Sequence, residues 1–92
     1  MPGRRIFIAE VLRDVGRRIA ELRHTAGLTQ AQVSEKLGVS TREYARIESG
    51  RANLTLATMV SVADVLGTCL AEMVVRPASQ EVKRGRPKRN RD

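Results

Sequence analysis

Apolar side chains recur along the first third of the chain with the spacing of an α-helix. They lie three or four positions apart, at Ile8, Leu12, Val15, Ile19 and Leu22. Residues at this spacing share one face of a helix, so the pattern predicts a helix that ends at Gly27. Residues 6–12 are either its first turns or a separate turn. Gly16 costs the helix about 1 kcal/mol of propensity, so we expect it to allow close packing against a neighbouring helix.

Residues 28–50 predict two short helices joined by a tight turn. Each helix begins with the spacing of a capping box, Thr29 with Gln32 and Ser40 with Glu43. Gly38 lies between them, where glycine adopts the left-handed conformation at little cost. Val39 should insert an apolar side chain beneath the corner.

The second of these helices, residues 40–49, has two chemically different faces. Tyr44 and Ile47 form an apolar inner face, and the opposite side carries Arg42, Ala45 and Arg46. Such a helix suits the DNA major groove, where arginine can donate two hydrogen bonds to guanine. The pattern predicts a helix-turn-helix, and an ordinary helical hairpin is the alternative.

Two further helices are expected after Asn53. Thr55 should cap the first and Gly67 should end it, and its apolar stripe consists of Leu56, Met59, Val60, Ala63 and Leu66. A short helix follows over residues 70–75. Pro77 ends the domain.

The charge of the chain is concentrated near its carboxyl end. Residues 1–75 carry ten basic and eight acidic side chains, a net +2, whereas residues 76–92 carry seven and two, a net +5. Such a segment implies a polyanionic partner, either nucleic acid or an anionic membrane surface. One cysteine, Cys69, excludes an intramolecular disulfide, and neither a membrane span nor a signal peptide is present, so we expect a cytoplasmic, nucleoid-associated protein.

Enzymatic function is not expected. The sequence offers no nucleophile with a matching base, no phosphate-cradling glycine loop and no Cys/His cluster with metal-ligand spacing. We therefore predict no catalytic residue, no cofactor and no metal site.

From about Val15 to Val74 the chain resembles the lambda-repressor-like, Cro-type helix-turn-helix (XRE) family of bacteria and phages. The matching residues are Gly16, Ile19, Leu22, Arg23, 26–30, 37–40, Ile47, Glu48, Gly50, Leu66 and Gly67. The resemblance implies an all-α, compact five-helix domain in which the region of the fifth helix often forms a dimer contact. Ser34 departs from the alanine that is usual in the family.

The resemblance also implies roles for individual residues. An ion pair between Arg23 and Glu48 should fix the angle of the recognition helix. The expected base-reading residues are Thr41, Arg42, Ala45 and Arg46. The expected phosphate contacts are Gln30, Arg51 and Asn53.

The end of the chain resembles an AT-hook. The residues concerned are Lys83, Arg84, Gly85, Arg86, Pro87, Lys88 and Arg89. Glycine lets the backbone approach the floor of the minor groove, and arginines can enter its negative potential. The expected organisation is an extension over residues 1–12, a domain over 13–76, and a linker with a disordered basic tail over 77–92.

The predicted function is sequence-specific binding of double-stranded DNA by a homodimeric transcriptional regulator, most simply a repressor. Two alternatives remain. One is the antitoxin of a toxin–antitoxin pair, which binds a toxin protein and regulates its own operon. The other is an architectural nucleoid protein whose tail dominates binding.

Overall fold

The computed structural model describes residues 7–75 and 77, and within them the chain is helical without strands. Its helices are α1 (Ile8–Ala26), α2 (Gln30–Leu37), α3 (Thr41–Glu48), α4 (Leu56–Leu66) and α5 (Leu70–Met73). The expected all-α, five-helix architecture is therefore confirmed. Because α1 begins at Ile8, residues 8–12 form its first turns. The basic tail lies outside the described residues.

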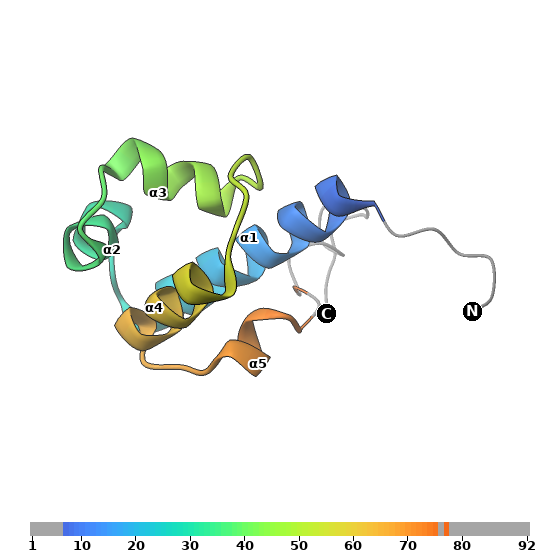
Figure 1. The fold of residues 1–92 in the computed structure, drawn as a ribbon. Helices are drawn as coiled ribbons and strands as arrows, with labels where there is room; N and C mark the ends of the chain where they lie inside the picture. The colour runs from blue at the N-terminus through green and yellow to red at the C-terminus, as the bar shows by residue number, and fades with distance from the viewer. Residues whose placement is uncertain (1–6, 76, 78–92) are drawn as a thin grey trace, which may run out of the picture.

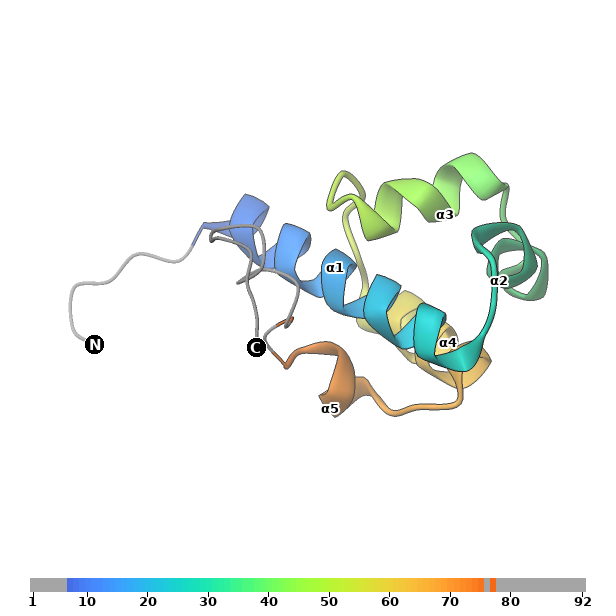
Figure 2. The ribbon, with the colours of Figure 1, turned by 180° about the vertical axis from the view of Figure 1, so that it is seen from behind.

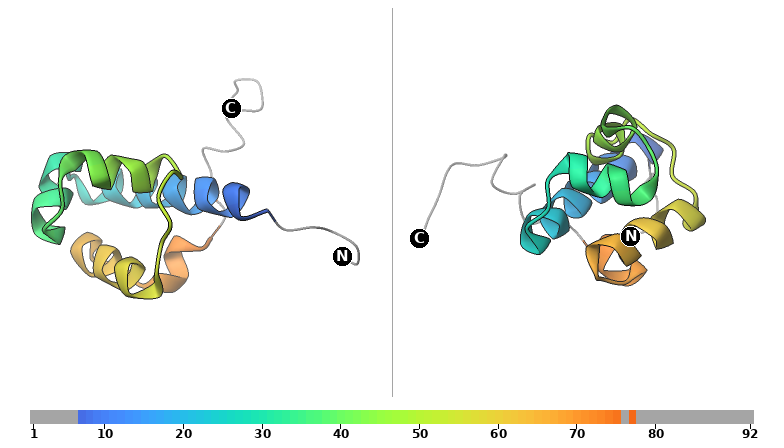
Figure 3. Two further views of the ribbon diagram at one scale, coloured as in Figure 1. Left: turned by 45° about the horizontal axis from the view of Figure 1, so that its top comes forward. Right: turned by 90° about the vertical axis from the view of Figure 1, so that its left-hand side faces the viewer.

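The long helix α1 is the centre of the arrangement. Figures 1 and 2 show α3 on one side of α1 and α5 on the other. Helix α2 packs against both α3 and α4, and α4 packs against α5, so the helices close around one core (Figure 3). This arrangement leaves one long side of α3 without a neighbouring helix.

The core is almost entirely aliphatic. Its buried members are Val15, Ile19, Val33, Tyr44, Ile47, Met59, Val62, Ala63, Leu66 and Met73. They come from all five helices. Burying each of the larger side chains contributes about 1.5–3 kcal/mol relative to leaving it in water, so this cluster is what fixes the helices relative to one another.

Some of the predicted apolar contacts are wrong. Leu56 and Val60 are 68% and 54% exposed, while Val62, absent from the predicted stripe, is fully buried. Leu56 lies in the first turn of α4, beyond the core. Val60 lies about 100° around the helix from the buried Met59. Val39 is also exposed at the corner between α2 and α3.

The last helix is shorter than predicted. It ends at Met73, which is fully buried, whereas Val74 and Val75 follow it and are exposed. Arg18 of α1 holds this helix in place, since its Nε donates to the backbone carbonyl of Glu72 at 2.8 Å and its Nη2 pairs with the Glu72 carboxylate at 3.0 Å. Nothing in the sequence spacing indicated this link across 54 residues.

Two glycines bring the carboxyl end of α3 against α1. A Cβ at Gly16 would lie 2.6 Å from the carbonyl oxygen of Glu48, which confirms the expected close packing. Gly50 has a φ of 79°, and a Cβ there would meet the backbone of Arg13. Both sites therefore exclude a side chain, and the backbones of α1 and α3 approach closely. None of the described helices combines the length and apolarity needed to cross a bilayer.

Candidate nucleic-acid interface

Side chains define both ends of the turn between α2 and α3. The Thr29 hydroxyl accepts from the backbone N–H of Gln32 at 3.0 Å, and the side-chain oxygen of Gln32 accepts from the backbone N–H of Thr29 at 2.8 Å. Ser40 and Glu43 form the same reciprocal pair at 3.0 and 3.1 Å. The Glu43 carboxylate is thereby used as a helix cap. Both predicted capping boxes are present, and they fix where the two helices begin.

An ion pair ties the end of α3 to α1. Arg23 Nε lies 2.6 Å from Glu48 Oε2, and Arg23 Nη2 lies 3.1 Å from Glu48 Oε1. Arg23 also donates to the carbonyl of Leu28 at 2.8 Å, and the Gln30 amide donates to Glu48 at 2.9 Å. Both members of the pair have side chains less than a tenth exposed. Three segments are therefore joined at the last residue of α3.

The charges in this cluster stabilise one another. Burial opposes ionisation of Glu48, but hydrogen bonds from Arg23 foremost and from Gln30 outweigh it, so the pKa of Glu48 is lowered. The hydrogen bond to Glu48 raises the pKa of Arg23 against the opposing effect of burial. Burial, assisted by the Glu48 carboxylate, raises the pKa of Tyr44 far above its ordinary value. At neutral pH the site thus holds one ion pair and a neutral phenol.

Ser34 has a local structural role that explains its departure from alanine. The residue is buried, and its hydroxyl donates to the carbonyl of Ala31 at 2.8 Å. It also lies 3.2 Å from the hydroxyl of Thr41, the first residue of α3. Serine, like alanine, is small enough to fit between α2 and α3, and its hydroxyl is hydrogen-bonded within the helix-turn-helix.

The outer face of α3 presents polar side chains to solvent. Tyr44 and Ile47 are buried, whereas Thr41, Arg42 and Arg46 are exposed. An α-helix with its side chains is about 10–12 Å across, which is close to the ~12 Å width of the major groove. Arg46 Nη2 donates to the carbonyl of Arg51 at 2.8 Å, which directs that guanidinium toward the loop after α3.

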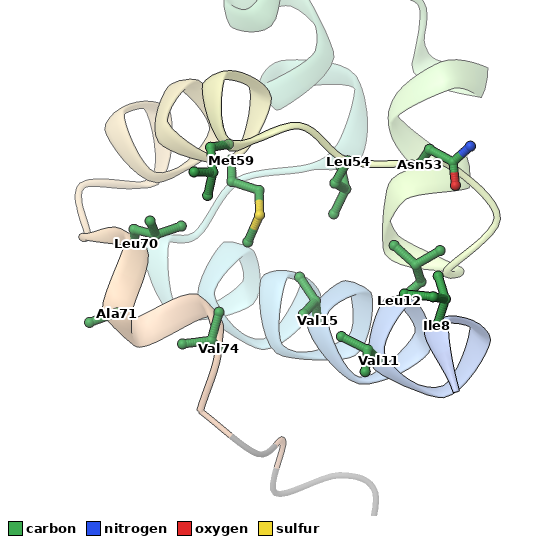
Figure 4. A pocket seen from close by; sticks show the side chains of 11 residues that line it. Ile8, Val11, Leu12, Val15, Asn53, Leu54, Met59, Leu70, Ala71 and Val74 are labelled. Carbon is green, nitrogen blue, oxygen red and sulfur yellow. The ribbon is translucent and has the colours of Figure 1, made fainter. Parts of the chain in front are cut away.

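The other predicted contact residues lie in different places. Gln30 and Ala45 line a small cavity of about 290 Å³ between α1, α2 and α3. Arg51 is exposed just after α3, but Asn53 lines an apolar groove on another part of the surface (Figure 4). The tail residues Lys83–Arg89 lie outside the described residues.

Two basic residues beside α3 were not predicted from the sequence. Arg13 and Arg17 of α1 line the same cavity as Gln30. Their separation of four positions places them on one helix face, and that was the available signal. The sequence did not show that α1 passes the end of α3 at this point, which depends on the close approach at Gly16. Among the described residues, no group of three His, Cys, Asp or Glu side chains could hold a metal ion.

Comparison with known proteins supports the geometry. Residues 14–74 match the family model of a helix-turn-helix domain. The chain is 34% identical over 64 residues to the cryptic phage CTXphi transcriptional repressor RstR of Vibrio cholerae, which covers 70% of this chain and 57% of that protein. It is 38% identical over 60 residues to the HTH-type transcriptional regulator y4dJ of Sinorhizobium fredii, and the match covers 65% of this chain and 78% of that protein. The chain thus spans little more than half the length of RstR.

Solved structures show the same fold. The restriction-modification controller protein C.AhdI from Aeromonas hydrophila aligns with a TM-score of 0.64 and 27% identity, over 67% of this chain and 94% of that one. The DNA-binding domain of BldD aligns with a TM-score of 0.66 over 73% of this chain and 97% of that one. At 22% identity this likeness shows a shared fold only.

Proposed function

Because this chain belongs to the helix-turn-helix domain family, we propose that it binds double-stranded DNA sequence-specifically and regulates transcription, most simply as a repressor. One observation carries the proposal: α3 is held at its end by the Arg23–Glu48 ion pair, while the side chains of Arg42 and Arg46 remain exposed on this helix. A rigidly held helix with exposed arginines meets the requirements for reading base edges. The relatives named above as transcriptional repressor and regulator support this reading.

The residues divide into readers and positioning contacts. Arg42 and Arg46 read guanine, while Thr41 and Ala45 contact neighbouring bases, Ala45 leaving room for a thymine methyl. Gln30 at the amino end of α2 and Arg51 just after α3 contact the phosphate backbone. The basic tail, Lys83–Arg89, adds phosphate and minor-groove contacts whose strength depends on salt.

A homodimer is part of this proposal, because one recognition helix covers only a half-site. An apolar groove of about 580 Å³ lies where the start of α1 faces α4 and α5 (Figure 4). Its apolar lining includes four large side chains that are more than two-fifths exposed: Ile8, Val11, Leu56 and Val74. We assign this groove to a second copy of the chain, in agreement with the dimer role implied for the region of the fifth helix.

Nuclease footprinting tests the proposal on DNA from upstream of the protein's own gene. The full chain is compared with a version that ends at Arg76. We expect both to protect two discrete half-sites about one helical turn apart, with weaker binding by the shorter form. Diffuse protection that disappears with the tail would instead support an architectural protein. No protection by either form would contradict DNA regulation at that site and favour the protein-binding antitoxin role.

A further inference from the structure

The cavity between α1 and the end of α3 has a basic wall. Arg13 and Arg17 line it from α1, Gln30 from the amino end of α2, and Glu48 and Ser49 from the end of α3. Its volume is about 290 Å³, and both polar and apolar side chains line it. The cavity is separate from the apolar groove at α5, with which it shares no lining residue.

The two arginines have no partner for their charge within the described part of the chain. None of the hydrogen bonds or salt bridges there involves the side chain of Arg13 or Arg17. The Arg17 Nε is buried and makes no hydrogen bond. A buried donor without an acceptor is costly, so a bound acceptor at this nitrogen would be stabilising.

The one acidic group at this cavity is already neutralised. Glu48 pairs with Arg23 at 2.6 Å and accepts from Gln30 at 2.9 Å. Arg13 and Arg17 therefore add positive charge without an ion-pair partner among the described residues, beside a carboxylate that is already paired. The neighbouring Arg18 differs, since it is paired with Glu21 at 3.2 Å and Glu72 at 3.0 Å.

The position of the cavity indicates which kind of ligand it would bind. It is bounded by Ala45 on α3 and by Gln30 at the start of α2, where helix amides and the helix dipole favour an anion. We propose that Arg13 and Arg17, together with Gln30, bind a phosphate of the DNA backbone beside the recognition helix. This inference rests on the proposed DNA-binding function, and it adds α1 to the surface that positions α3 in the groove.

The salt dependence of binding tests this site. Arg17→Gln, in the full chain, should weaken binding by a similar factor on the selected target and on random DNA. Each lost phosphate contact should reduce the slope of log K against log salt by about 1, and Arg13→Gln should act in the same direction. Arg18→Gln is the matched control: it breaks the α1–α5 pair and should leave the slope of the folded protein unchanged.

The outcomes separate this inference from the proposed function. If Arg17→Gln binds DNA as tightly as wild type and with the same slope of log K against log salt, the phosphate site alone is overturned. If the wild-type protein binds no DNA, both the phosphate site and the proposed function are overturned. Nitrogen-labelled arginine provides a second readout by NMR, because the Arg17 Nε–H signal should shift on adding DNA. An equal shift with inorganic phosphate alone would show a small-anion site and contradict the DNA assignment.

Discussion

Single residues decide how α3 is presented, and Glu48 is the most informative of them. It closes the ion pair with Arg23 and accepts from Gln30, so its carboxylate is required in the charged form. Removing one partner of such a buried pair typically costs about 3–5 kcal/mol, because the other charge is left uncompensated. The pair is therefore better described as fixing the position of α3 than as a large net source of stability.

The lowered pKa of Glu48 predicts a pH dependence of folding. In the unfolded chain the carboxyl returns to its ordinary pKa of 4.5, whereas in the fold its pKa is lower. The folded state thus binds fewer protons, so the stabilisation is complete above the unfolded pKa and is lost as pH falls through the folded one. Urea unfolding between about pH 6 and pH 3 should show this loss.

Two glutamine variants separate this effect from general acid denaturation. Glu48→Gln should be less stable at neutral pH and should lose part of the acid dependence. Glu35→Gln, at an exposed position in α2, should keep the wild-type profile. An unchanged profile in Glu48→Gln would show that another carboxyl is responsible.

At the scale of elements, much of the helix-turn-helix could be predicted from local spacing. Capping boxes and glycine stops are set by residues three to five positions apart, and both predicted caps are present. The errors arose where tertiary packing decides the outcome. Periodicity alone could not tell that Leu56 lies beyond the core or that Val62 faces into it. Similarly, the placement of Arg17 beside Gln30 depends on how α1 crosses α3.

The crossing of α1 and α3 predicts the effect of a substitution at Gly16. In an isolated helix, alanine would be more stable than glycine by about 1 kcal/mol. Here its Cβ would meet the backbone carbonyls of Ile47 and Glu48, neither of which can move like a flexible side chain. Gly16→Ala should therefore destabilise the domain by roughly 1–3 kcal/mol in urea unfolding.

A control for this prediction lies on the same helix. Ala9 is exposed near the start of α1, so Ala9→Gly should report helix propensity alone, a loss of about 0.5–1 kcal/mol. If Gly16→Ala were more stable than wild type, the close backbone contact between α1 and α3 would be wrong.

At the scale of the whole molecule, α3 lies on one side of α1 and α5, which contributes to the apolar groove, lies on the other (Figure 1). A second copy seated on the groove therefore leaves α3 free to bind DNA. This separation predicts that association and base reading can be altered independently. In the proposed complex, the charge of +5 in residues 76–92 should add a sequence-independent attraction to DNA.

The proposed dimer predicts different effects for two exposed valines. Val74 lines the groove and is 60% exposed, so Val74→Asp should leave the fold intact but shift sedimentation toward monomer. Val60 is 54% exposed but does not line the groove. Val60→Asp should therefore sediment like wild type. Equal behaviour of the two variants would place the dimer contact elsewhere or exclude it.

The most direct test of the central claim is the affinity of Arg42→Ala for a panel of single-base-pair variants of the selected DNA site, compared with wild type. If the exposed face of α3 reads bases, Arg42→Ala should lose about 1–3 kcal/mol on the preferred site and become indifferent at one base-pair position. Arg42→Lys keeps the charge but not the two-donor geometry, so it should lose the same preference with a smaller loss of affinity. An equal loss on every variant, with all preferences retained, would show that Arg42 contacts only the backbone and would contradict base reading by this residue of α3.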